Sequence, residues 1–501
     1  MSPIASPRPA SPRRALSAAA IMVAGSLAFA PALAPLPAWA RSTPESFAEL
    51  VEQVNPAVVQ IVVKKEMTAA NEGSAPGLPE GFPEGQFRDF FERFFRDQTP
   101  GPTPPRGEVG ALGSGFVIDP SGIVVTNNHV ISDAREISVR TKDGDEYAAE
   151  LVGADDKTDL AVLRVDAKKP LPAVNWGDSD KIRVGDWVVA VGNPFGLGGT
   201  VTAGIVSARG REIGAGPYDD FIQIDAPINT GNSGGPLFNV DGAVVGVNTA
   251  IYSPNGGSIG IGFAIPSDMA AKVVAQLRQS GSVERGWLGV MIQPVTPEIA
   301  ESLGLDKAAG ALVTEVTADS PAAKAGLHQG DVVLSYEGKE INTLRDLSRA
   351  VADTPVGSKA SIQIVRDRKE KTVTAKIGAQ ENKTVVATKA EKSGQDGAGG
   401  TSLSRLGLTV APLDAETRSR LGVNSATKGV VIAEVADDKN AAEKGLRPGD
   451  IITSVNQKAV NSPSDVAAAV EEAAKAKRKA VLLLVERDGQ QRFVAVELAD
   501  A

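Results

Sequence analysis

A serine and a histidine in this chain stand in contexts that suit nucleophilic catalysis. Ser233 lies in the string GNSGGPL, and His129, one of only two histidines, lies in the string NNHV. A serine hydroxyl attacks an amide at neutral pH only when a base takes its proton, and histidine suits that task best. Asp159 lies between them in the chain and offers a carboxylate to orient the imidazole. The three residues predict a serine endopeptidase.

The glycines beside Ser233 serve the same chemistry. They let the backbone N–H groups of Gly231 and Ser233 turn toward one point, where they stabilise the oxyanion of a tetrahedral intermediate. We therefore assign the predicted oxyanion hole to Gly231, Asn232 and Ser233. The alternatives are a polar turn between strands at Ser233 and a hydrogen-bonded core histidine at His129.

Asp159 is preferred over its acidic neighbours because the apolar run LAVL follows it directly. This run draws the carboxylate inward, and the aspartate of a triad needs burial. Asp155 and Asp156 are expected in an exposed turn.

The string around Ser233 also satisfies the Gly-x-Ser-x-Gly motif of α/β-hydrolases. That motif needs a helix after the serine and a downstream histidine. Glycine, glycine and proline follow here instead, and the downstream His328 corresponds to Arg447 in a second copy of its segment. This alternative is rejected.

The surrounding sequence has the spacing of a mainly β protein. Residues 109–265 hold short β-type runs separated by Gly, Asp and Asn, which favours a sandwich or barrel. Helical periodicity then predicts a helix from Pro266 to Gly281.

The remaining chain is an internal repeat. Nine residues recur at a constant offset of 119, beginning with Gly310 and Gly429, so two copies of one module are present. Lys389 to Ser402, rich in Lys, Gly, Gln and Asp, is the predicted flexible linker.

The N-terminal segment has the pattern of a signal peptide at residues 1–40. Three arginines precede an apolar run, and an Ala-Trp-Ala cleavage site follows. The formal net charge of −9 includes those arginines, so the remaining chain carries about −12. That charge argues against nucleic acid as a partner. The absence of cysteine excludes disulfides and a thiolate nucleophile.

A separate segment from Asn71 to Glu108 is rich in Pro and Gly yet holds five phenylalanines between Phe87 and Phe95. Their spacing predicts an amphipathic helix. The alternatives are local packing on the protease domain and an intermolecular or regulatory contact.

Together these motifs resemble the HtrA/Deg family of serine endopeptidases, most of all its periplasmic Do branch. The resemblance covers nearly the whole chain after residue 40 and includes the strings TNNHV, DLAVL, GNSGGPL and IGIGFAIP. It implies a chymotrypsin-like double β-barrel followed by two PDZ domains, which are small, partly open α+β barrels. The expected domains are a signal peptide at 1–40, a protease domain at 41–280 with a Phe-rich insertion at about 66–109, a first PDZ domain at 281–380, a linker at 381–402 and a second PDZ domain at 403–501.

The resemblance also implies substrate-binding residues. Ile228, Ile251 and Ile261 are expected to line a pocket for Val, Ile or Ala, although all three are also ordinary candidates for core positions. The peptide carboxylate loop of the first PDZ domain is assigned to Arg285, Gly286, Trp287, Leu288 and Gly289. The segment from Arg405 to Leu408 is a looser match in the second domain.

The expected function is ATP-independent degradation of unfolded or misfolded proteins in the periplasm, with chaperone activity and no metal or cofactor. Expected partners are unfolded polypeptides, protein C-termini and further copies of the chain in homotrimers or larger oligomers; membrane association is not required. A histidine base must be neutral, so activity should fall below about pH 6.5. The alternative is a peptide-binding chaperone or adaptor with a vestigial protease domain.

Overall fold

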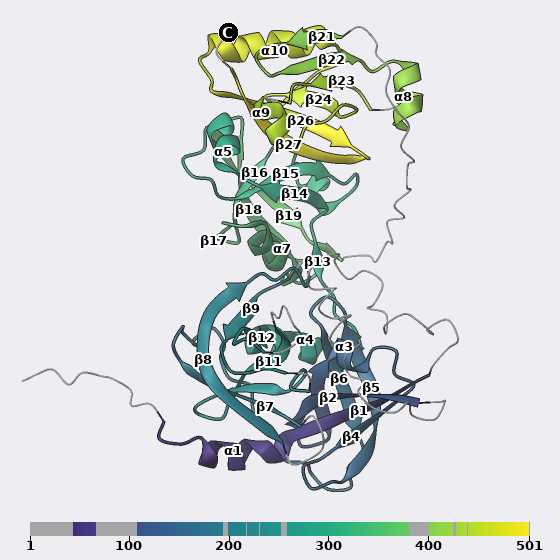
Figure 1. The fold of residues 1–501 in the computed structure, drawn as a ribbon, viewed down its shortest axis with the longest axis vertical. Coiled ribbons are helices and arrows are strands. Elements are labelled where there is room, and N and C mark those ends of the chain that lie inside the picture. Colours follow the sequence, from purple (N-terminus) through teal and green to yellow (C-terminus); the bar gives the residue numbers. More distant parts are fainter. Residues whose placement is uncertain are drawn as a thin grey trace, which may run out of the picture. The chain divides into compact units, whose positions relative to one another are not determined.

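The computed structural model describes residues 44–66, 108–193, 199–216, 218–229, 231–251, 258–379, 400–423, 427–437 and 439–499. The predicted signal peptide and the predicted Phe-rich helix lie outside these ranges. The elements below belong to the unit Ala48–Ala501 (Figure 1).

The first half of the protease region is a closed six-stranded barrel with the strand order β1-β2-β3-β6-β5-β4. It follows a short helical entry. β3 shows why the barrel closes, since all five of its residues are buried and its neighbours pair with it on both edges. The elements are α1 (Ala48–Val54), η1 (Asn55–Ala57), β1 (Val58–Glu66), β2 (Glu108–Asp119), β3 (Ile123–Asn127), α3 (Asn128–Ile131), β4 (Glu136–Arg140), β5 (Glu146–Asp155) and β6 (Leu160–Val165).

A second closed six-stranded barrel follows, with the strand order β10-β11-β12-β9-β8-β7. Its strands are β7 (Trp187–Gly192), β8 (Thr200–Arg211), β9 (Phe221–Ile224), β10 (Pro236–Asn239), β11 (Val244–Ile251) and β12 (Gly262–Pro266). All eight residues of β11 are buried, as expected of a strand enclosed on both faces. The two barrels confirm the predicted chymotrypsin-like fold class.

The helix α4 (Ser267–Ser280) packs against strands of both barrels. Pro266 precedes its first turn, and Gly281, in the left-handed conformation, ends it as predicted. Val273, Val274 and Leu277 form its buried face. Arg278 adds an ion pair with Asp119 at 2.9 Å, which joins the helix to the end of β2.

The first repeat is built on a six-stranded sheet with β14 at its edge. β13 lies apart and pairs with β20. The elements are β13 (Gly286–Trp287), β14 (Val290–Pro294), α5 (Pro297–Leu303), β15 (Ala311–Val316), α6 (Pro321–Lys324), β16 (Val332–Tyr336), β17 (Lys339–Glu340), α7 (Leu344–Ala352), β18 (Lys359–Arg366), β19 (Lys369–Lys376) and β20 (Gly378–Ala379).

The second repeat follows the element order of the first without a counterpart of β20 in the described residues, and its sheet has one strand more. The additional strand is β21, which pairs with β22. The elements are β21 (Thr401–Leu403), β22 (Leu408–Pro412), α8 (Ala415–Leu421), β23 (Val430–Val435), α9 (Asn440–Glu443), β24 (Ile451–Val455), β25 (Lys458–Ala459), α10 (Pro463–Lys475), β26 (Ala480–Arg487) and β27 (Gln490–Glu497).

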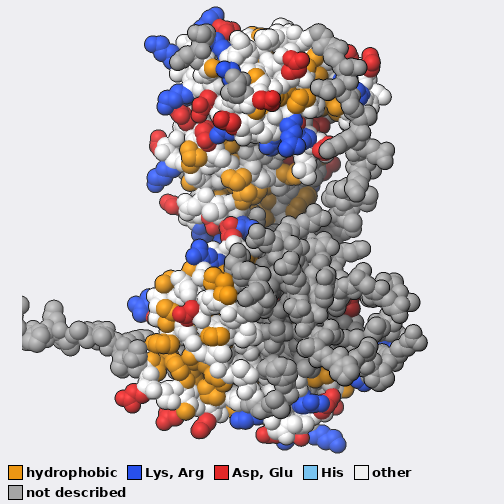
Figure 2. All heavy atoms as spheres, in the orientation of Figure 1, with side chains coloured by type: hydrophobic (Ala, Val, Ile, Leu, Met, Phe, Trp, Pro, Cys, Tyr) orange, Lys and Arg blue, Asp and Glu red, His pale blue; other side chains and the backbone are white. Residues whose placement is uncertain are grey.

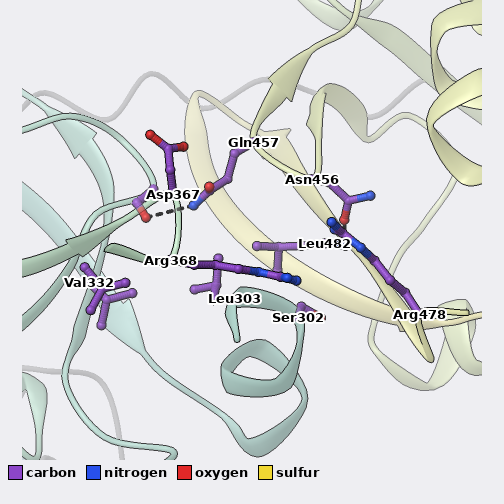
Figure 3. A pocket seen from close by; sticks show the side chains of 11 residues that line it. Ser302, Leu303, Val332, Asp367, Arg368, Asn456, Gln457, Arg478 and Leu482 are labelled. Atoms are coloured by element: carbon purple, nitrogen blue, oxygen red, sulfur yellow. Dashed lines mark hydrogen bonds between the residues drawn. The ribbon is translucent and has the colours of Figure 1, made fainter. Parts of the chain in front are cut away.

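Side chains of the two repeats contact one another through an apolar cluster that contains Leu303 of α5 and Leu482 of β26. A pocket of about 240 Å³ adjoins this cluster, and the side chains of Arg368 and Arg478 line it from the two repeats (Figure 3). Gln457 closes one side by donating a hydrogen bond to the carbonyl of Gly330 at 2.9 Å.

Lysine and arginine side chains are interspersed with acidic ones over the described residues on the face shown in Figure 2. None of the helices in the described ranges combines the length and apolar character that a membrane span requires.

Each repeat has a buried aspartate paired with an arginine. Asp450 is 1 % exposed and receives bonds from Nε and Nη2 of Arg487 at 2.5 and 2.6 Å. Asp331 and Arg366 form the same pair in the first repeat. The hydrogen bond that Arg487 donates to the Asp450 carboxylate raises the pKa of the guanidinium. The guanidinium of Arg487 therefore stays charged beside this carboxylate.

We predict that Asp450→Ala lowers the free energy of unfolding of the second repeat by about 3 kcal/mol or more, because it leaves a partly buried guanidinium without its partner. Chemical denaturation of the full chain measures this change, with unfolding monitored by a spectroscopic signal from the second repeat. Glu472→Ala is the matched control: Glu472 also pairs with a base, Lys458, but both side chains are about two-thirds exposed. Equal free energies of unfolding for the two variants would show that the buried pair does not stabilise the second repeat.

Candidate active site

His129 and Asp159 are joined by two hydrogen bonds. His129 Nδ1 lies 2.6 Å from Asp159 Oδ2, and the backbone N–H of His129 donates to Oδ1 at 2.9 Å. His129 sits in α3, directly after the buried strand β3, while Asp159 directly precedes β6. Because β3 and β6 pair in the sheet, the two side chains meet at one end of the first barrel. The carboxylate thus fixes the orientation of the ring and leaves Nε2 for another partner.

The backbone at Asp159 has an uncommon conformation, with φ at +56°. Asp and Asn tolerate this left-handed region better than other non-glycine residues. Neighbouring groups hold it there, since its carbonyl accepts hydrogen bonds from Asn127 Nδ2 at 2.8 Å and from the N–H of Asn128 at 3.1 Å. This conformation is what turns the carboxylate back toward His129.

Ser233 lies on the loop before β10 in the second barrel and is held by Ser114 of the first barrel. The backbone N–H of Ser114 donates to the carbonyl of Ser233 at 2.9 Å, and its hydroxyl donates to the carbonyl of Gly231. The same hydroxyl accepts a hydrogen bond from the N–H of Asn193 at 2.8 Å. Ser114 therefore fixes two carbonyl groups of the serine loop.

Gly234 shows how closely the two barrels approach at this loop. Its φ is +81°, and an added Cβ atom would lie 2.3 Å from the carbonyl oxygen of Ser114 and 2.4 Å from Thr126 Oγ1. No other residue type fits this position without moving backbone atoms. The glycine after the serine is thus a requirement of the junction between the barrels.

A chain of hydrogen bonds joins the His129–Asp159 pair to Ser233. Asn127 Nδ2, which donates to the Asp159 carbonyl, also lies 3.1 Å from Thr249 Oγ1. The hydroxyl of Ser233 donates to the carbonyl of Thr249 at 3.4 Å. His129 and Ser233 are each 6 % exposed. The structure therefore brings the three predicted residues to one junction between the barrels, where His129 and Ser233 are buried and Asp159 is half-buried.

The backbone N–H groups around Ser233 differ in whether they donate hydrogen bonds to carbonyls of the protein. Those of Asn232, Gly234 and Gly235 donate to the carbonyls of Asn229, Asn248 and Asn232 at 2.8–3.1 Å. Among the described residues, no backbone acceptor is recorded for the N–H groups of Gly231 and Ser233. The N–H of Asn232, part of the predicted oxyanion hole, is thus already used within the loop.

The three predicted pocket isoleucines have different surroundings. Ile228 and Ile251 are 1 % and 2 % exposed and belong to the apolar core of the second barrel. Ile261 is half-buried just before β12. Only Ile261 has substantial free surface in this structure, so it is the best placed of the three to contact a substrate.

Arg285 has a contact different from the one expected for a peptide-binding loop. Its guanidinium donates to both carboxylate oxygens of Asp155 at 2.9 and 2.6 Å and lies 4.8 Å from the ring centroid of Tyr218. Burial raises the pKa of the Tyr218 hydroxyl, which stays neutral beside this ion pair. The Arg285 side chain is thus bonded to the protease domain, and the part of Arg285 in a peptide-binding loop stays a prediction.

Asp155 itself was expected in an exposed turn, and that expectation is wrong. It is 5 % exposed and also accepts a hydrogen bond from the N–H of Thr158 at 3.1 Å. Asp156 is exposed as expected. Arg285 and Asp155 thus brace the turn that leads into Asp159.

The other residues of the predicted peptide loop are placed differently again. Gly286 pairs with Ala379, and an added Cβ atom there would lie 2.1 Å from the carbonyl oxygen of Val351. Leu288 is buried in the core of the first repeat, and Trp287 is half-buried. Only the backbone of this loop, including Gly289, remains for a peptide carboxylate.

Sequence reasoning did not find Ser114, Asn127 or Asp155 as members of this site. Ser114 carries no motif of its own, and its role depends on the approach of two barrels that are distant in the chain. Asn127 lies two residues before His129, so its position in the string before the histidine was the available signal.

Two family models match the chain in agreement with this architecture. The model described as trypsin-like peptidase domain matches residues 113–247, and the model described as PDZ domain matches residues 286–377 and 404–498. The barrels and repeats thus define a serine endoprotease that carries two PDZ domains.

Curated relatives narrow this class. The chain is 48 % identical over 470 residues to "Probable periplasmic serine endoprotease DegP-like" of Brucella suis, covering 90 % of this chain and 89 % of the relative. A protein of the same name from Ectopseudomonas mendocina is 44 % identical over 465 residues, covering 92 % and 95 % of the two chains. A solved structure of the HtrA-type protease AlgW with a decapeptide matches with a TM-score of 0.55 and 44 % identity, covering 68 % of this chain and 100 % of AlgW. The chain belongs to the HtrA-type, DegP-like periplasmic serine endoproteases.

We predict that Ser114→Ala lowers kcat by about 10²-fold with little change in KM, because the loop that carries Ser233 loses its hydroxyl tether and shifts. Steady-state kinetics on a peptide substrate measure both constants. Ser121→Ala is the matched control, since Ser121 lies on the same hairpin but its hydroxyl donates to the half-buried Asp119. Unchanged kcat in Ser114→Ala would show that the tether does not position the site.

Proposed function

We propose that this endoprotease degrades unfolded or misfolded proteins of the cell envelope without ATP, with Ser233 as nucleophile, His129 as general base and Asp159 as the orienting carboxylate. The observation that carries the proposal is the hydrogen-bond chain from Asp159 and His129 through Asn127 and Thr249 to Ser233.

The chemistry follows the triad scheme. Ser233 Oγ attacks the scissile carbonyl while His129 accepts its proton, and Asp159 stabilises the imidazolium that forms. The N–H groups of Gly231 and Ser233 stabilise the oxyanion. His129 then gives the proton to the leaving amine, and water hydrolyses the acyl-enzyme through the same base.

The burial of the site supports an unfolded substrate. With Ser233 and His129 each 6 % exposed, the nucleophile presents little surface to a folded protein. An extended segment without tertiary structure enters such a junction more readily. The PDZ domains add peptide capture, which also supports chaperone activity on the same polypeptides. Assembly into homotrimers and larger oligomers is part of this proposal.

We predict that Ser233→Ala, His129→Ala and Asp159→Asn each lower proteolysis of an unfolded protein such as reduced casein by about 10⁴-fold or more. The chain offers matched controls. His328, the other histidine, and Asp156, in the same turn as Asp159, are both exposed, so His328→Ala and Asp156→Asn should retain activity.

Circular dichroism checks that each variant is folded. Undiminished cleavage by folded Ser233→Ala protein would overturn the assignment. Full retention of substrate binding and refolding activity, with no proteolysis in the unaltered chain, would instead favour the chaperone or adaptor alternative.

For specificity, we predict cleavage after Val, Ile or Ala, since the isoleucine side chains offer no charge to Lys or Arg. Mass-spectrometric mapping of cut sites in an unfolded protein measures the preference. Ile261→Ala should broaden it toward larger apolar residues, whereas Ile259→Ala, at a position that is 49 % exposed, should not. A preference for basic residues would contradict the pocket assignment.

A further inference from the structure

The two PDZ domains differ at the strand where a peptide binds. PDZ domains capture an extended peptide as an added strand, with its carboxylate held in a backbone loop. In the first domain that strand is β14, which follows the loop at Gly289. Its equivalent in the second domain is β22, 118 residues further on, which follows Gly407. Gly289 and Gly407 have similar backbone conformations, with φ at +81° and +67°.

The free edge of this strand is open in one domain and covered in the other. Within the described residues, β14 pairs only with β15 and ends its sheet. β22 pairs with β23 on one side and with β21 on the other. Figure 1 places β21 beside β22 and α10, and contacts join β21 to both elements. β21 thus lies where the first domain has room for a ligand.

The direction of β21 is that of a bound peptide. A peptide whose carboxylate lies in the loop must run antiparallel to the strand that leaves the loop. β21 runs into the loop and pairs antiparallel with β22, with Leu403 opposite Leu408 and Thr401 opposite Val410. At the position where a bound peptide would end in its free carboxylate, β21 instead continues into the loop.

The side chains agree with this interpretation. Leu403 is 6 % exposed and packs in the same core cluster as Val466 and Val470 of α10. Leu408 and Val410 of β22 are also buried in it. Their equivalents in the first domain, Val290 and Ile292, are only partly buried. Leu403 therefore fills the apolar site between strand and helix.

The residues before the loop explain the difference between the domains. In the first domain the equivalent of Leu403 is Arg285, whose side chain is held by Asp155 of the protease domain. The chain is thereby drawn away from β14. In the second domain the apolar side chain of Leu403 cannot form such an ion pair, and its segment folds back on β22 as a hairpin.

We propose that the segment Thr401–Leu403 occupies the peptide groove of the second PDZ domain, so that peptide C-termini bind to the first domain alone unless this segment is displaced. The inference rests on the proposed peptide capture by the PDZ domains.

Peptide stoichiometry tests it. The probe is a synthetic decapeptide ending in Val with a free carboxylate, titrated calorimetrically into full-length Ser233→Ala protein. We expect about one peptide per chain, and about two for the added Leu403→Ser variant, whose segment no longer holds the groove. Two peptides per chain without the Leu403 change would overturn the proposal, as would no second site in a folded Leu403→Ser protein.

A disulfide tests the strand position independently of peptide binding. The chain has no cysteine, so Ser402→Cys with Thr409→Cys creates a single possible pair. These residues face one another in the ladder, at a Cα separation of about 4.5–5.5 Å that a disulfide spans. We expect complete disulfide formation under mild oxidation, and still about one peptide per chain.

The two tests distinguish failure of the proposed β21 position from failure of peptide capture by the PDZ domains. Persistent free thiols in the folded double-cysteine protein would show that β21 does not lie on β22 and would overturn the inference. If the disulfide forms but no peptide binds to any variant, peptide capture by the first domain fails, and the proposal that only this domain binds peptides falls with it.

Discussion

The two barrels meet through hydrogen bonds that leave little freedom at the serine loop. Ser114 bonds to the carbonyls of Gly231 and Ser233 across this junction, and Asn127 reaches Thr249. Gly234 permits the close approach because a side chain there would overlap Ser114. Since His129 and Ser233 come from different barrels, their relative position depends on these few contacts.

Much of the fold could be predicted from the sequence. Strand-length apolar runs indicated the barrels, Pro266 and Gly281 marked the helix α4, and the constant offset of Gly310 and Gly429 revealed the repeat. The residues proposed for catalysis could be predicted for a different reason. Histidine is scarce in this chain, and the serine and the aspartate stand in distinctive strings. Local patterns carry such information well.

The contacts that the sequence did not reveal are those between distant segments. Asp155 was expected in solvent because its neighbours are polar, yet a guanidinium 130 residues away buries it. Likewise, two repeats with one sequence pattern differ in β21: before the first loop Asp155 holds Arg285, whereas before the second loop Leu403 packs in the core of its own domain. A local sequence pattern predicts a helix or a strand, whereas the segment that packs against it is determined by the assembled fold.

Each barrel and each repeat is formed by one uninterrupted stretch of chain, with β1 to β6 complete before β7 begins. Such modules fold one after another as a polypeptide emerges N-terminus first. The first barrel carries His129 and Asp159 but not Ser233, so, with the roles proposed above, a nascent chain with this barrel alone has the general base without the nucleophile. With these proposed roles, competence for hydrolysis arises only when the second barrel docks against the first.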